Sequence, residues 1–412
     1  MSRLADLINE LCPDGVEYRR LDELFATRNG YTPSRSDASA WDSHDIPWFR
    51  MEDIRENGGI LDRALTYISS SAVKNGVLFP ENSLLVATSA TIGAHALITV
   101  PHLSNQRFTS LRLKDEYRKY FDYRFLYYYC FVLDAFCLEH VNVSSFPSVD
   151  MRAFRSFKFP VVPLAVQREI VRILDQFTTL EAELEAELEA RRAQYEYYRN
   201  QLLSYDALVS RCPNGVQYKS IGSFSKCVAG ATPNSKNPSL WDGDIPWMSS
   251  GEVNKKTVYS TNRFITQLGF DSCSTKMVPA GAVVIALAGQ GKTRGTVARI
   301  RIELCTNQSL CAIITDKTVD SDYLFHYLSG QYDNLRAVSS GDGTRGGLNL
   351  KMIRAYKVPV PPIEEQRRIA DVLDRFDTLV NDISSGLPAE IAARRAQYEY
   401  YRDRLLSFPE KK

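Results

Sequence analysis

A fifteen-residue segment occurs twice in this chain and constrains the fold more than any other feature. Residues 190–204 read ARRAQYEYYRNQLLS and residues 393–407 read ARRAQYEYYRDRLLS, so thirteen of the fifteen positions match. Each copy follows a much longer stretch that is far less similar between the two halves. This pattern is typical of an internally duplicated protein in which a constant frame carries two variable inserts.

The two inserts keep the same order of short motifs. A Thr-Pro pair at residues 32–33 and at 232–233 is followed by an Ile-Pro-Trp triplet that ends at Trp48 and at Trp247. The offset between equivalent motifs stays between 199 and 203 residues. We therefore predict one ancestral unit copied in tandem, with Trp48 and Trp247 as core anchors.

Each insert is predicted to contain a sheet covered by a helix. Short apolar runs at residues 83–87 and 282–287 are bounded by turn residues and indicate buried strands. Aromatic-rich segments at 120–133 and 322–330 indicate helices. We expect their tyrosines to pack in the core, because large aromatic rings more often fill a core than stack on bases. Each insert should be a mixed α/β domain with a curved sheet.

A proline-marked exit leads from each insert into a long helix. Apolar residues recur at spacings of three and four from residue 170 to 202, which predicts one amphipathic helix over 167–203, about 55 Å long. Such a stripe needs a partner, and the duplicate at 364–406 supplies one in an antiparallel coiled coil. The Ser-Gly-Leu-Pro sequence at 385–388 predicts a break in that second helix, whereas LEAELEAELEA at 180–190 favours an unbroken first one.

These features predict an α+β protein in which two tandem mixed α/β domains are separated by two long antiparallel coiled-coil helices, in a circular pseudo-two-fold repeat. The predicted parts are an N-terminal helix at 1–11 that packs near the C-terminus, a first domain at 12–162, a central spacer helix at 163–205, a second domain at 206–360 and a C-terminal spacer helix at 361–412.

Composition excludes several classes of protein. No apolar run approaches the roughly 20 residues that cross a bilayer, and acidic residues interrupt the first eleven positions where a signal peptide needs an apolar stretch. We therefore expect a cytoplasmic protein. The eight cysteines form no CxxC pair and have no histidine at zinc-like spacing, so we expect reduced thiols and no metal site.

The net charge of +1 hides a difference between the inserts. Residues 206–360 hold 18 basic and 11 acidic side chains, whereas residues 1–160 hold 18 basic and 20 acidic ones. A surface that attracts phosphates is thus predicted directly for the second insert. The first insert requires its positive charge to be locally clustered if it meets DNA.

No catalytic signature is complete. Residues 288–295, AGQGKTRG, end like a phosphate-binding loop, but Ala286 stands where that pattern requires glycine. The five histidines have no equivalent positions across the repeat and no spaced partner. We therefore predict a non-catalytic chain, with two alternatives left open: a nucleotide-using enzyme around Lys292, and a coiled-coil scaffold that does not read DNA.

Polar and basic loop residues recur at matching places of both inserts, and we predict that they contact DNA, because such side chains bond base edges and phosphate oxygens. In the first insert these are Thr32, Ser34, Arg35, Thr88, Ser89, Thr91, Arg107, Asn142, Ser144 and Ser145. In the second insert they are Thr232, Ser235, Lys236, Gln290, Lys292, Thr293, Arg294, Ser339, Ser340, Thr344, Arg345, Asn349 and Lys351.

The motifs in this order resemble the specificity subunit of type I restriction-modification systems. The shared features are Thr-Pro, Trp followed by Ile-Pro-Trp, Asn-Gln, and the proline-rich exit into a Gln-Arg helix, each present twice. The Gln-Tyr-Glu-Tyr-Tyr-Arg copies and the Glu-Ala-Glu-Leu repeats are similar to the branch of that family whose central spacer helix carries tetrapeptide repeats. The resemblance covers nearly the whole chain.

The resemblance implies a DNA sequence-recognition subunit for host defence that has no catalytic activity. Each domain would read one half of a bipartite double-stranded DNA target, and the coiled coil would set the spacer and dock two modification (methyltransferase) subunits. This chain would carry no cofactor: S-adenosylmethionine would belong to the modification subunits, and ATP and Mg to the restriction subunits of the full complex. The expected docking residues are Arg191, Arg192, Tyr195, Tyr198, Arg199, Arg394, Arg395, Tyr398, Tyr401 and Arg402.

Overall fold

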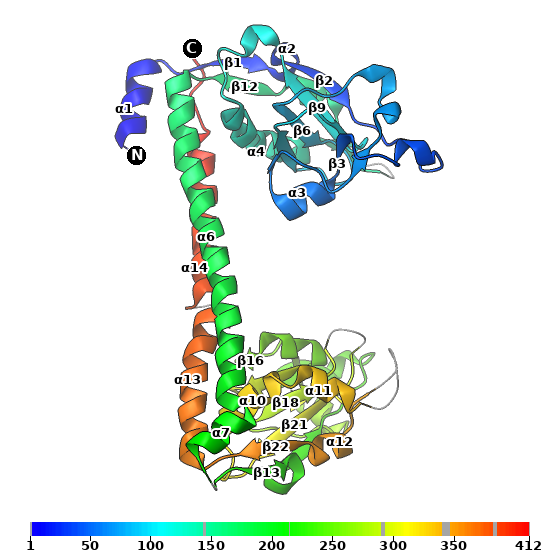
Figure 1. The fold of residues 1–412 in the computed structure, drawn as a ribbon, viewed down its shortest axis with the longest axis vertical. Helices are drawn as coiled ribbons and strands as arrows, with labels where there is room; N and C mark the ends of the chain where they lie inside the picture. The colour runs from blue at the N-terminus through cyan, green and yellow to red at the C-terminus, as the bar shows by residue number, and fades with distance from the viewer. Residues whose placement is uncertain are drawn as a thin grey trace. The chain divides into compact units, whose positions relative to one another are not determined.

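The chain forms two compact units, each of which contains a sheet assembly and part of the helical frame (Figure 1). Unit 1 comprises residues 1–183 and 391–412, and unit 2 comprises residues 184–390. The computed structural model describes residues 2–142, 146–213, 215–289, 293–339, 347–381 and 385–411.

Unit 1 is built on a five-stranded sheet and a three-stranded sheet. The first has the order β2 (Phe25–Asn29), β9 (Phe108–Leu113), β6 (Ser83–Ala87), β7 (His95–Ile98) and β4 (Ile60–Leu61). The second has the order β5 (Tyr67–Ile68), β3 (Ile46–Phe49) and β8 (Leu103–Ser104). The neighbours from β2 to β7 are antiparallel, whereas β4 runs parallel to β7 and β8 runs parallel to β3.

Unit 2 repeats both sheets strand for strand. Its five-stranded sheet has the order β14 (Ser225–Ala229), β21 (Leu310–Thr315), β18 (Val283–Ala286), β19 (Val297–Ile300) and β16 (Thr257–Val258). Its three-stranded sheet has the order β17 (Arg263–Ile265), β15 (Trp241–Met248) and β20 (Cys305–Thr306). The same connectivity twice in one chain confirms the predicted duplication and the α+β class.

A short antiparallel pair joins the start and the end of each insert. In unit 1 this pair is β1 (Glu17–Arg20) with β12 (Lys158–Val161), and in unit 2 it is β13 (Gln217–Ser220) with β22 (Lys357–Val360). Unit 1 also contains β10 (Val141–Asn142) paired with β11 (Ser148–Val149). Short helices complete the inserts: α2 (Leu21–Leu24), α3 (Met51–Asn57), α5 (Met151–Ser156), α8 (Ile221–Phe224), α9 (Gln267–Asp271), α11 (Tyr332–Ala337) and α12 (Leu350–Ala355).

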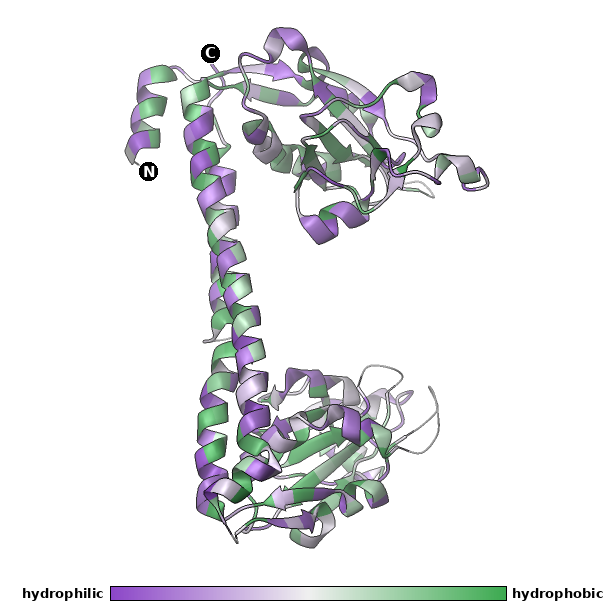
Figure 2. Cartoon of the chain, in the orientation of Figure 1, coloured by the Kyte–Doolittle hydropathy of each residue, from purple (hydrophilic) through white to green (hydrophobic). Residues whose placement is uncertain are grey.

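One helix covers each large sheet, α4 (Tyr123–Glu139) in unit 1 and α10 (Ser321–Ser329) in unit 2. Both begin because an aspartate caps them: the carboxylate of Asp122 or Asp320 accepts hydrogen bonds from the first backbone N–H groups. The central strands and the covering helices contain many hydrophobic residues (Figure 2), and residues from both belong to one buried cluster in each unit. Tyr128 and Tyr129 are buried in this core, as predicted for the aromatic segment.

The frame consists of α6 (Leu164–Leu203), α13 (Ile363–Asn381) and α14 (Leu387–Leu405). Helix α6 is 40 residues long, or about 60 Å at 1.5 Å per residue. In unit 1 its first half pairs antiparallel with α14, where Phe177 stacks on Tyr401 at 5.6 Å between ring centroids. In unit 2 Phe376 of α13 stacks on Tyr198 of α6 at 5.7 Å.

The second arm of the frame is two helices and not one. Helix α13 ends at Asn381, and α14 begins at Leu387 with Pro388 in its first turn. Proline fits there because the first turn of a helix leaves its backbone N–H groups unpaired. The Ser-Gly-Leu-Pro sequence therefore separates the helices, as its composition predicts.

The end of the chain closes unit 1. The N–H of Val16 donates to Pro409 O at 2.9 Å, and the N–H of Lys411 donates back to Val16 O at 2.9 Å. The hydroxyl of Tyr18 donates to Phe408 O. The flanking helices are α1 (Ser2–Leu11) in unit 1 and α7 (Tyr205–Arg211) in unit 2. The two ends of the chain thus meet, in agreement with the predicted circular arrangement.

The sequence predicts no transmembrane segment and reduced thiols, and both predictions concern features that can be described for the described residues. Their helices include none with the length and hydropathy of a transmembrane segment. All eight cysteines lie in the described part of the chain and are free thiols, six of them buried.

Candidate DNA interface

Loop segments that are far apart in sequence meet in unit 1. The hydroxyl of Thr32 donates to the side-chain oxygen of Gln106. The N–H of Thr88 donates to Arg107 O at 3.0 Å, and the N–H of Val149 donates to Thr88 O at 2.9 Å. Direct hydrogen bonds therefore join the Thr-Pro segment, the β6–β7 loop, the turn after Asn105 and the segment before α5.

Unit 2 builds the same junction with equivalent residues. The hydroxyl of Thr232 donates to Gln308, as Thr32 does to Gln106. The N–H of Leu287 donates to Ser309 O at 2.8 Å, and the N–H of Leu348 donates to Leu287 O at 3.0 Å. Because both backbone bonds have direct counterparts in unit 1, the convergence of loops is a property of the repeated fold.

A pair of tryptophans holds the Thr-Pro segment in each unit. In unit 1 the rings of Trp41 and Trp48 lie 5.3 Å apart and nearly perpendicular, and their indole N–H groups donate to the backbone oxygens of Ser34 and Tyr31. In unit 2 the rings of Trp241 and Trp247 lie 5.1 Å apart and bond Asn234 and Ala231 in the same way.

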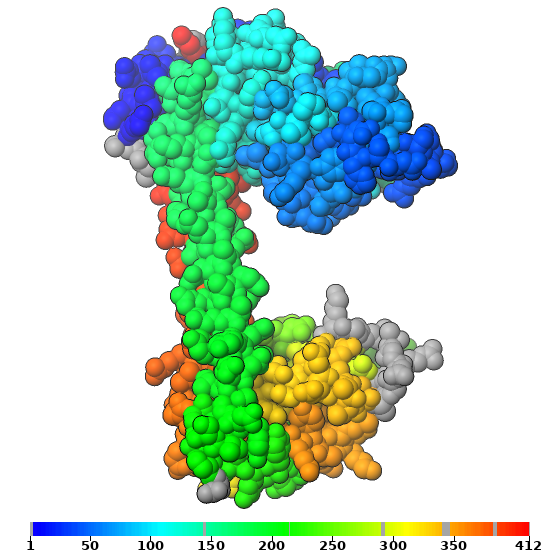
Figure 3. Space-filling view, in the orientation of Figure 1, coloured from blue at the N-terminus to red at the C-terminus, as the bar shows by residue number. Residues whose placement is uncertain are grey.

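Trp48 and Trp247 are buried, which agrees with their interpretation as core anchors. In unit 1 the Thr-Pro segment held by Trp48 belongs to the N-terminal part of the chain, which is drawn in blue in Figure 3.

A glycine before each Thr-Pro segment allows the loops to approach closely. A Cβ atom at residue 30 would lie 2.1 Å from Asn105 O, and one at residue 230 would lie 1.7 Å from Thr306 O. Either distance is far below van der Waals contact, so only glycine fits here without a shift of the backbone. The Thr-Pro segment is thereby held directly against the Asn-Gln turn.

Basic side chains gather around the junction of unit 1 despite the acidic balance of that insert. Arg35 and Arg107 are exposed on two of the joined loops. Lys74 is a third exposed cation. Its Nζ lies 4.5 Å from the ring centroid of Tyr31, the residue that precedes the Thr-Pro pair. Arg35, Lys74 and Arg107 thus belong to, bond or contact the joined loop segments of unit 1.

In unit 2, Ser235 and Lys236 are exposed on the Thr-Pro segment, and the guanidinium of Arg263 stacks 3.7 Å from the ring centre of Trp241. Lys74 and Arg263 were not among the residues predicted from sequence. They occupy no equivalent positions in the repeat, so the comparison of motifs could not find them. The number of basic residues in the second insert was the only sequence signal for Arg263.

Several predicted contact residues have buried or occupied side chains. Thr88 is 8% exposed, and its hydroxyl is hydrogen-bonded to that of Thr109 at 2.8 Å. Arg294 is also buried. The side-chain oxygen of Asn349 accepts the N–H of Met352 at 3.0 Å and caps α12. Thr88 and Arg294 are thus buried in the described structure, whereas Asn349 is exposed and its side chain caps α12.

The other predicted contact residues divide by exposure. Ser34, Asn142, Thr232 and Lys351 are exposed, whereas Thr32, Ser89, Thr91, Thr293 and Ser339 are partly buried. Ser144, Ser145, Gln290, Lys292, Ser340, Thr344 and Arg345 lie outside the described residues.

The tyrosines of the repeated frame segment differ in how far they are exposed. Tyr195 is 5% exposed and its hydroxyl is hydrogen-bonded to His326 Nδ1 at 3.0 Å. Tyr198 and Tyr401 stack on phenylalanines of the partner helix, and Tyr398 is half-buried. In contrast, Tyr197 and Tyr400 are 60% and 59% exposed, and neither was among the predicted docking residues.

The frame arginines are largely engaged within their own unit. Arg191 pairs with Glu187 at 2.8 Å, Arg395 pairs with Glu181, and Arg402 lies 4.5 Å from the ring centroid of Phe131. The predicted docking residues Arg192 and Arg394 are exposed, and Arg199 is half-buried.

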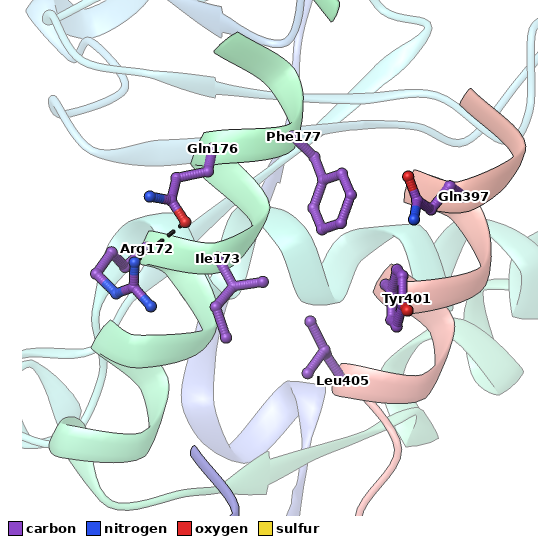
Figure 4. Close-up of a pocket in the computed structure, with 7 residues that line it drawn as sticks. All are labelled: Arg172, Ile173, Gln176, Phe177, Gln397, Tyr401 and Leu405. Atoms are coloured by element: carbon purple, nitrogen blue, oxygen red, sulfur yellow. Dashed lines mark hydrogen bonds between the residues drawn. The ribbon is translucent and has the colours of Figure 1, made fainter. Parts of the chain in front are cut away.

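In unit 1 a cleft of about 280 Å³ lies between α6 and α14 (Figure 4). It is lined by Arg172, Ile173, Gln176, Phe177, Gln397, Tyr401 and Leu405.

The buried histidines serve structural roles. His102 packs between the rings of Phe49 and Phe79, and burial lowers its pKa to about 4. His95 is paired with Asp134 at 2.6 Å in the core of unit 1. No group of three or more His, Cys, Asp or Glu side chains in the described ranges is arranged to hold a metal ion.

A family model for the type I restriction modification DNA specificity domain matches residues 13–190 and, a second time, residues 213–393. The chain belongs to this family. Over 399 residues it is 41% identical to the type I restriction enzyme EcoprrI specificity subunit of Escherichia coli, and the match covers 93% of each chain. It is 40% identical over 253 residues to the EcoR124I/EcoR124II specificity subunit of Escherichia coli, covering 61% of each chain.

Solved structures support the fold. A structure reported for complex assembly and conformational transition of the type I R-M system covers 96% of this chain and 98% of its own, with a TM-score of 0.63 at 16% identity. The type I restriction-modification S subunit of M. genitalium matches with a TM-score of 0.53 at 14% identity, covering 96% and 97%.

Membership of this family identifies the chain as a specificity subunit of a type I restriction-modification system with two target-recognition domains. Such subunits recognise the target and do not catalyse. Neither the nucleotide-using enzyme nor the scaffold that ignores DNA finds support in these comparisons.

Proposed function

We propose that each insert reads one half of a bipartite double-stranded DNA target through its converging loops. The first reader would comprise residues 12–162 and the second residues 206–360. The observation that carries the proposal is that equivalent hydrogen bonds build the loop junction twice, on two sheets of identical strand order. Two copies of one reading surface require two stretches of DNA.

Exposed cations of the junction are suited to phosphates, and short polar side chains are suited to base edges. We assign the phosphate contacts of the first reader to Arg35, Lys74 and Arg107, and those of the second reader to Lys236 and Arg263. Base contacts are assigned to the exposed or partly buried polar residues of the same loops, together with the predicted residues that lie outside the described ranges. Thr88, Arg294 and Asn349 instead support these loops.

The frame would fix the gap between the two half-sites. Helix α6 runs without interruption through the Glu-Ala-Glu-Leu repeats, and alanine, leucine and glutamate are strong helix formers. Each reader is packed on its own part of the frame, so the length of the helix determines how many base pairs stay unread. The parts before, between and after the readers would be residues 1–11, 163–205 and 361–412.

The frame would also dock two modification subunits, one on each copy of the repeated segment. Tyr197 and Tyr400 occupy equivalent positions and are the more exposed aromatic rings of that segment, and exposed tyrosines are frequent anchors of interfaces. Arg192 and Arg394 are exposed on the same copies. In the assembled system S-adenosylmethionine would be held by the modification subunits, and ATP and Mg by the restriction subunits, in the cytoplasm.

The test is a survey of methylated sites. The chain would be combined with the modification subunits of its own system and offered random DNA, and methylated positions would be read by sequencing. The proposal predicts two defined half-sites separated by one constant number of unspecified base pairs. Methylation without any sequence preference would overturn it, and so would methylation of a single uninterrupted site.

A further inference from the structure

A buried arginine connects the second recognition sheet to the frame. Arg299 lies on β19, its side chain is 6% exposed, and its guanidinium reaches helix α13. It pairs there with Asp374 and, at 3.1 Å, with Asp377. Its remaining donors bond Asp322 on α10 at 3.0 Å and Thr257 on β16 at 2.9 Å. One side chain thus holds the sheet, its covering helix and the frame together.

A second basic residue makes a parallel connection. Lys256 stands beside Arg299 at the sheet edge, where the N–H of Arg299 donates to Lys256 O at 2.8 Å. The ammonium of Lys256 donates to Asn381 on α13 at 3.1 Å. Asp374, Asp377 and Asn381 follow one another at spacings of three and four, so they share one face of α13. The second reader therefore contacts a polar stripe of its spacer helix through Arg299 and Lys256.

Unit 1 lacks this stripe. Leu97 occupies the place of Arg299, because its N–H donates to Gly59 O at 2.8 Å as that of Arg299 does to Lys256 O. Helix register, set by the equivalent residues Gln167 and Gln366, puts Thr178 and Ala182 in the places of Asp377 and Asn381. The frame of unit 1 keeps the aspartate, Asp175, which bonds Tyr128 at 2.6 Å and pairs with Arg124 at 2.9 Å.

The two kinds of contact differ in how strictly they fix geometry. In unit 1 these polar links to the frame come from the covering helix α4, whereas the sheet residue Leu97 can make only apolar side-chain contacts. Apolar contacts are non-directional and tolerate small rotations and slides. A buried guanidinium that is shared by three carboxylates has fixed bond directions, and any displacement would leave a buried charge without its partner. A slide of about 3.4 Å along the DNA axis corresponds to one base pair.

We propose that Arg299 is a positioning residue. It fixes where the second recognition domain lies along α13, and thereby the number of base pairs between the two half-sites. The inference rests on the proposed function. It concerns the spacing between the half-sites and leaves the sequence that each loop surface reads unchanged.

The test replaces the unit 2 residues by their unit 1 counterparts in the double variant Arg299→Leu/Asp377→Thr. This exchange removes the guanidinium together with one of its carboxylates, and Asp374 keeps His326 as a partner at 2.7 Å. Arg301→Leu is the matched control, because Arg301 pairs with Asp322 at 2.8 Å but with no residue of α13 among its described contacts. The complete complex is assembled with each chain, and the methylated sites are sequenced.

The double variant should retain both half-site sequences and show at least a tenfold rise in the share of sites whose gap differs by one base pair. Arg301→Leu and the unsubstituted chain should keep one gap. An unchanged single gap in the double variant would overturn the inference.

If the double variant yields no methylation, Asp377→Asn decides, since it keeps the size of the side chain: a relaxed gap supports the inference and a fixed gap overturns it. Absence of two half-sites with a constant gap in the unsubstituted chain would instead refute the proposed function.

Discussion

Gln167 and Gln366 make the same three hydrogen bonds, one set in each unit. The side-chain oxygen of Gln167 accepts the N–H of Asp122 at 2.8 Å, and that of Gln366 accepts the N–H of Asp320 at 2.8 Å. Their amide groups donate to two backbone oxygens each, those of Tyr120 and Val162 in unit 1 and those of Thr318 and Pro361 in unit 2. Each glutamine therefore joins the first turn of a frame helix to the cap of the helix that covers the sheet.

Replacing Gln366 by leucine should destabilise unit 2 by roughly 3 kcal/mol, because three buried backbone groups lose their partner and each such loss costs about 1–3 kcal/mol, partly offset by the apolar side chain. The midpoint of urea unfolding, followed by circular dichroism, measures the effect. Gln176→Leu is a suitable control, since Gln176 is exposed and bonds only Arg172 among its described contacts. Equal midpoints for the two variants would contradict the structural role of Gln366.

The sequence predicted the frame better than it predicted the roles of individual frame residues. The spacing of three and four along 167–203 predicted the helix, and Gln167 was placed near its start. The hydrogen bonds of Gln167 could not be predicted, because its partners Asp122 and Tyr120 lie 45 and 47 residues earlier in the sequence. Only the folding of the first insert brings them next to the helix. Local periodicity reports which face of a helix is apolar, but it does not identify the loop that meets its first turn.

The same limit applies to the burial of individual site residues, which the sequence does not reveal. Thr88 and Arg294 lie in polar loops, and composition alone cannot separate a side chain under a loop from one on its surface. Tyr195 belongs to the apolar stripe that the spacing predicted, and its burial agrees with that stripe. Tyr195 was assigned to docking because it belongs to the repeated segment. Buried Tyr195 and exposed Tyr197 are both repeated, so repetition alone cannot distinguish them.

Gly230→Ala should impair the second reader alone. A Cβ atom at this position would lie 1.7 Å from Thr306 O, so the Thr-Pro segment must move away from the Asn-Gln turn. We expect at least a tenfold loss of methylation at complete sites, with unchanged preference at the first half-site. Gly251→Ala provides the control, because a Cβ there meets no atom within 4 Å. Wild-type methylation by Gly230→Ala would show that the loop junction is dispensable.

His102 should make unit 1 sensitive to mild acid. Burial lowers its pKa from 6.5 to about 4, so between these values the unfolded chain binds the proton that the folded chain excludes. The free energy of unfolding should therefore fall with decreasing pH, by about 2 kcal/mol from pH 7 to pH 5.

The second unit has Leu304 at the equivalent place, which makes His102→Leu the informative variant. Urea unfolding at both pH values should show that this substitution removes most of the decline. A decline of the same size in His102→Leu would assign the sensitivity to other groups.

Tyr197 and Tyr400 should contribute to assembly without contributing to folding. Each is more than half exposed, and truncation of an interface tyrosine often costs 1 kcal/mol or more, or about fivefold in affinity. We expect Tyr197→Ala and Tyr400→Ala each to weaken the binding of one modification subunit, and the double variant to weaken both, as measured by analytical ultracentrifugation. Tyr259→Ala, which removes a ring that is 69% exposed on unit 2 but does not belong to a frame helix, should bind normally.

Insertion of one Glu-Ala-Glu-Leu tetrapeptide after Leu184 should lengthen the gap between the half-sites. Four residues add about 6 Å to α6 and turn it by about 400°, only 40° beyond a full turn, so the inward face is nearly kept. At 3.4 Å per base pair, 6 Å corresponds to one or two additional pairs. The survey of methylated sites should show both half-sites unchanged and the gap longer by that amount.

Insertion of two residues is the control, because it rotates the following helix by about 200° and should abolish methylation. A gap that stays the same after the tetrapeptide insertion would mean that α6 does not set the spacing.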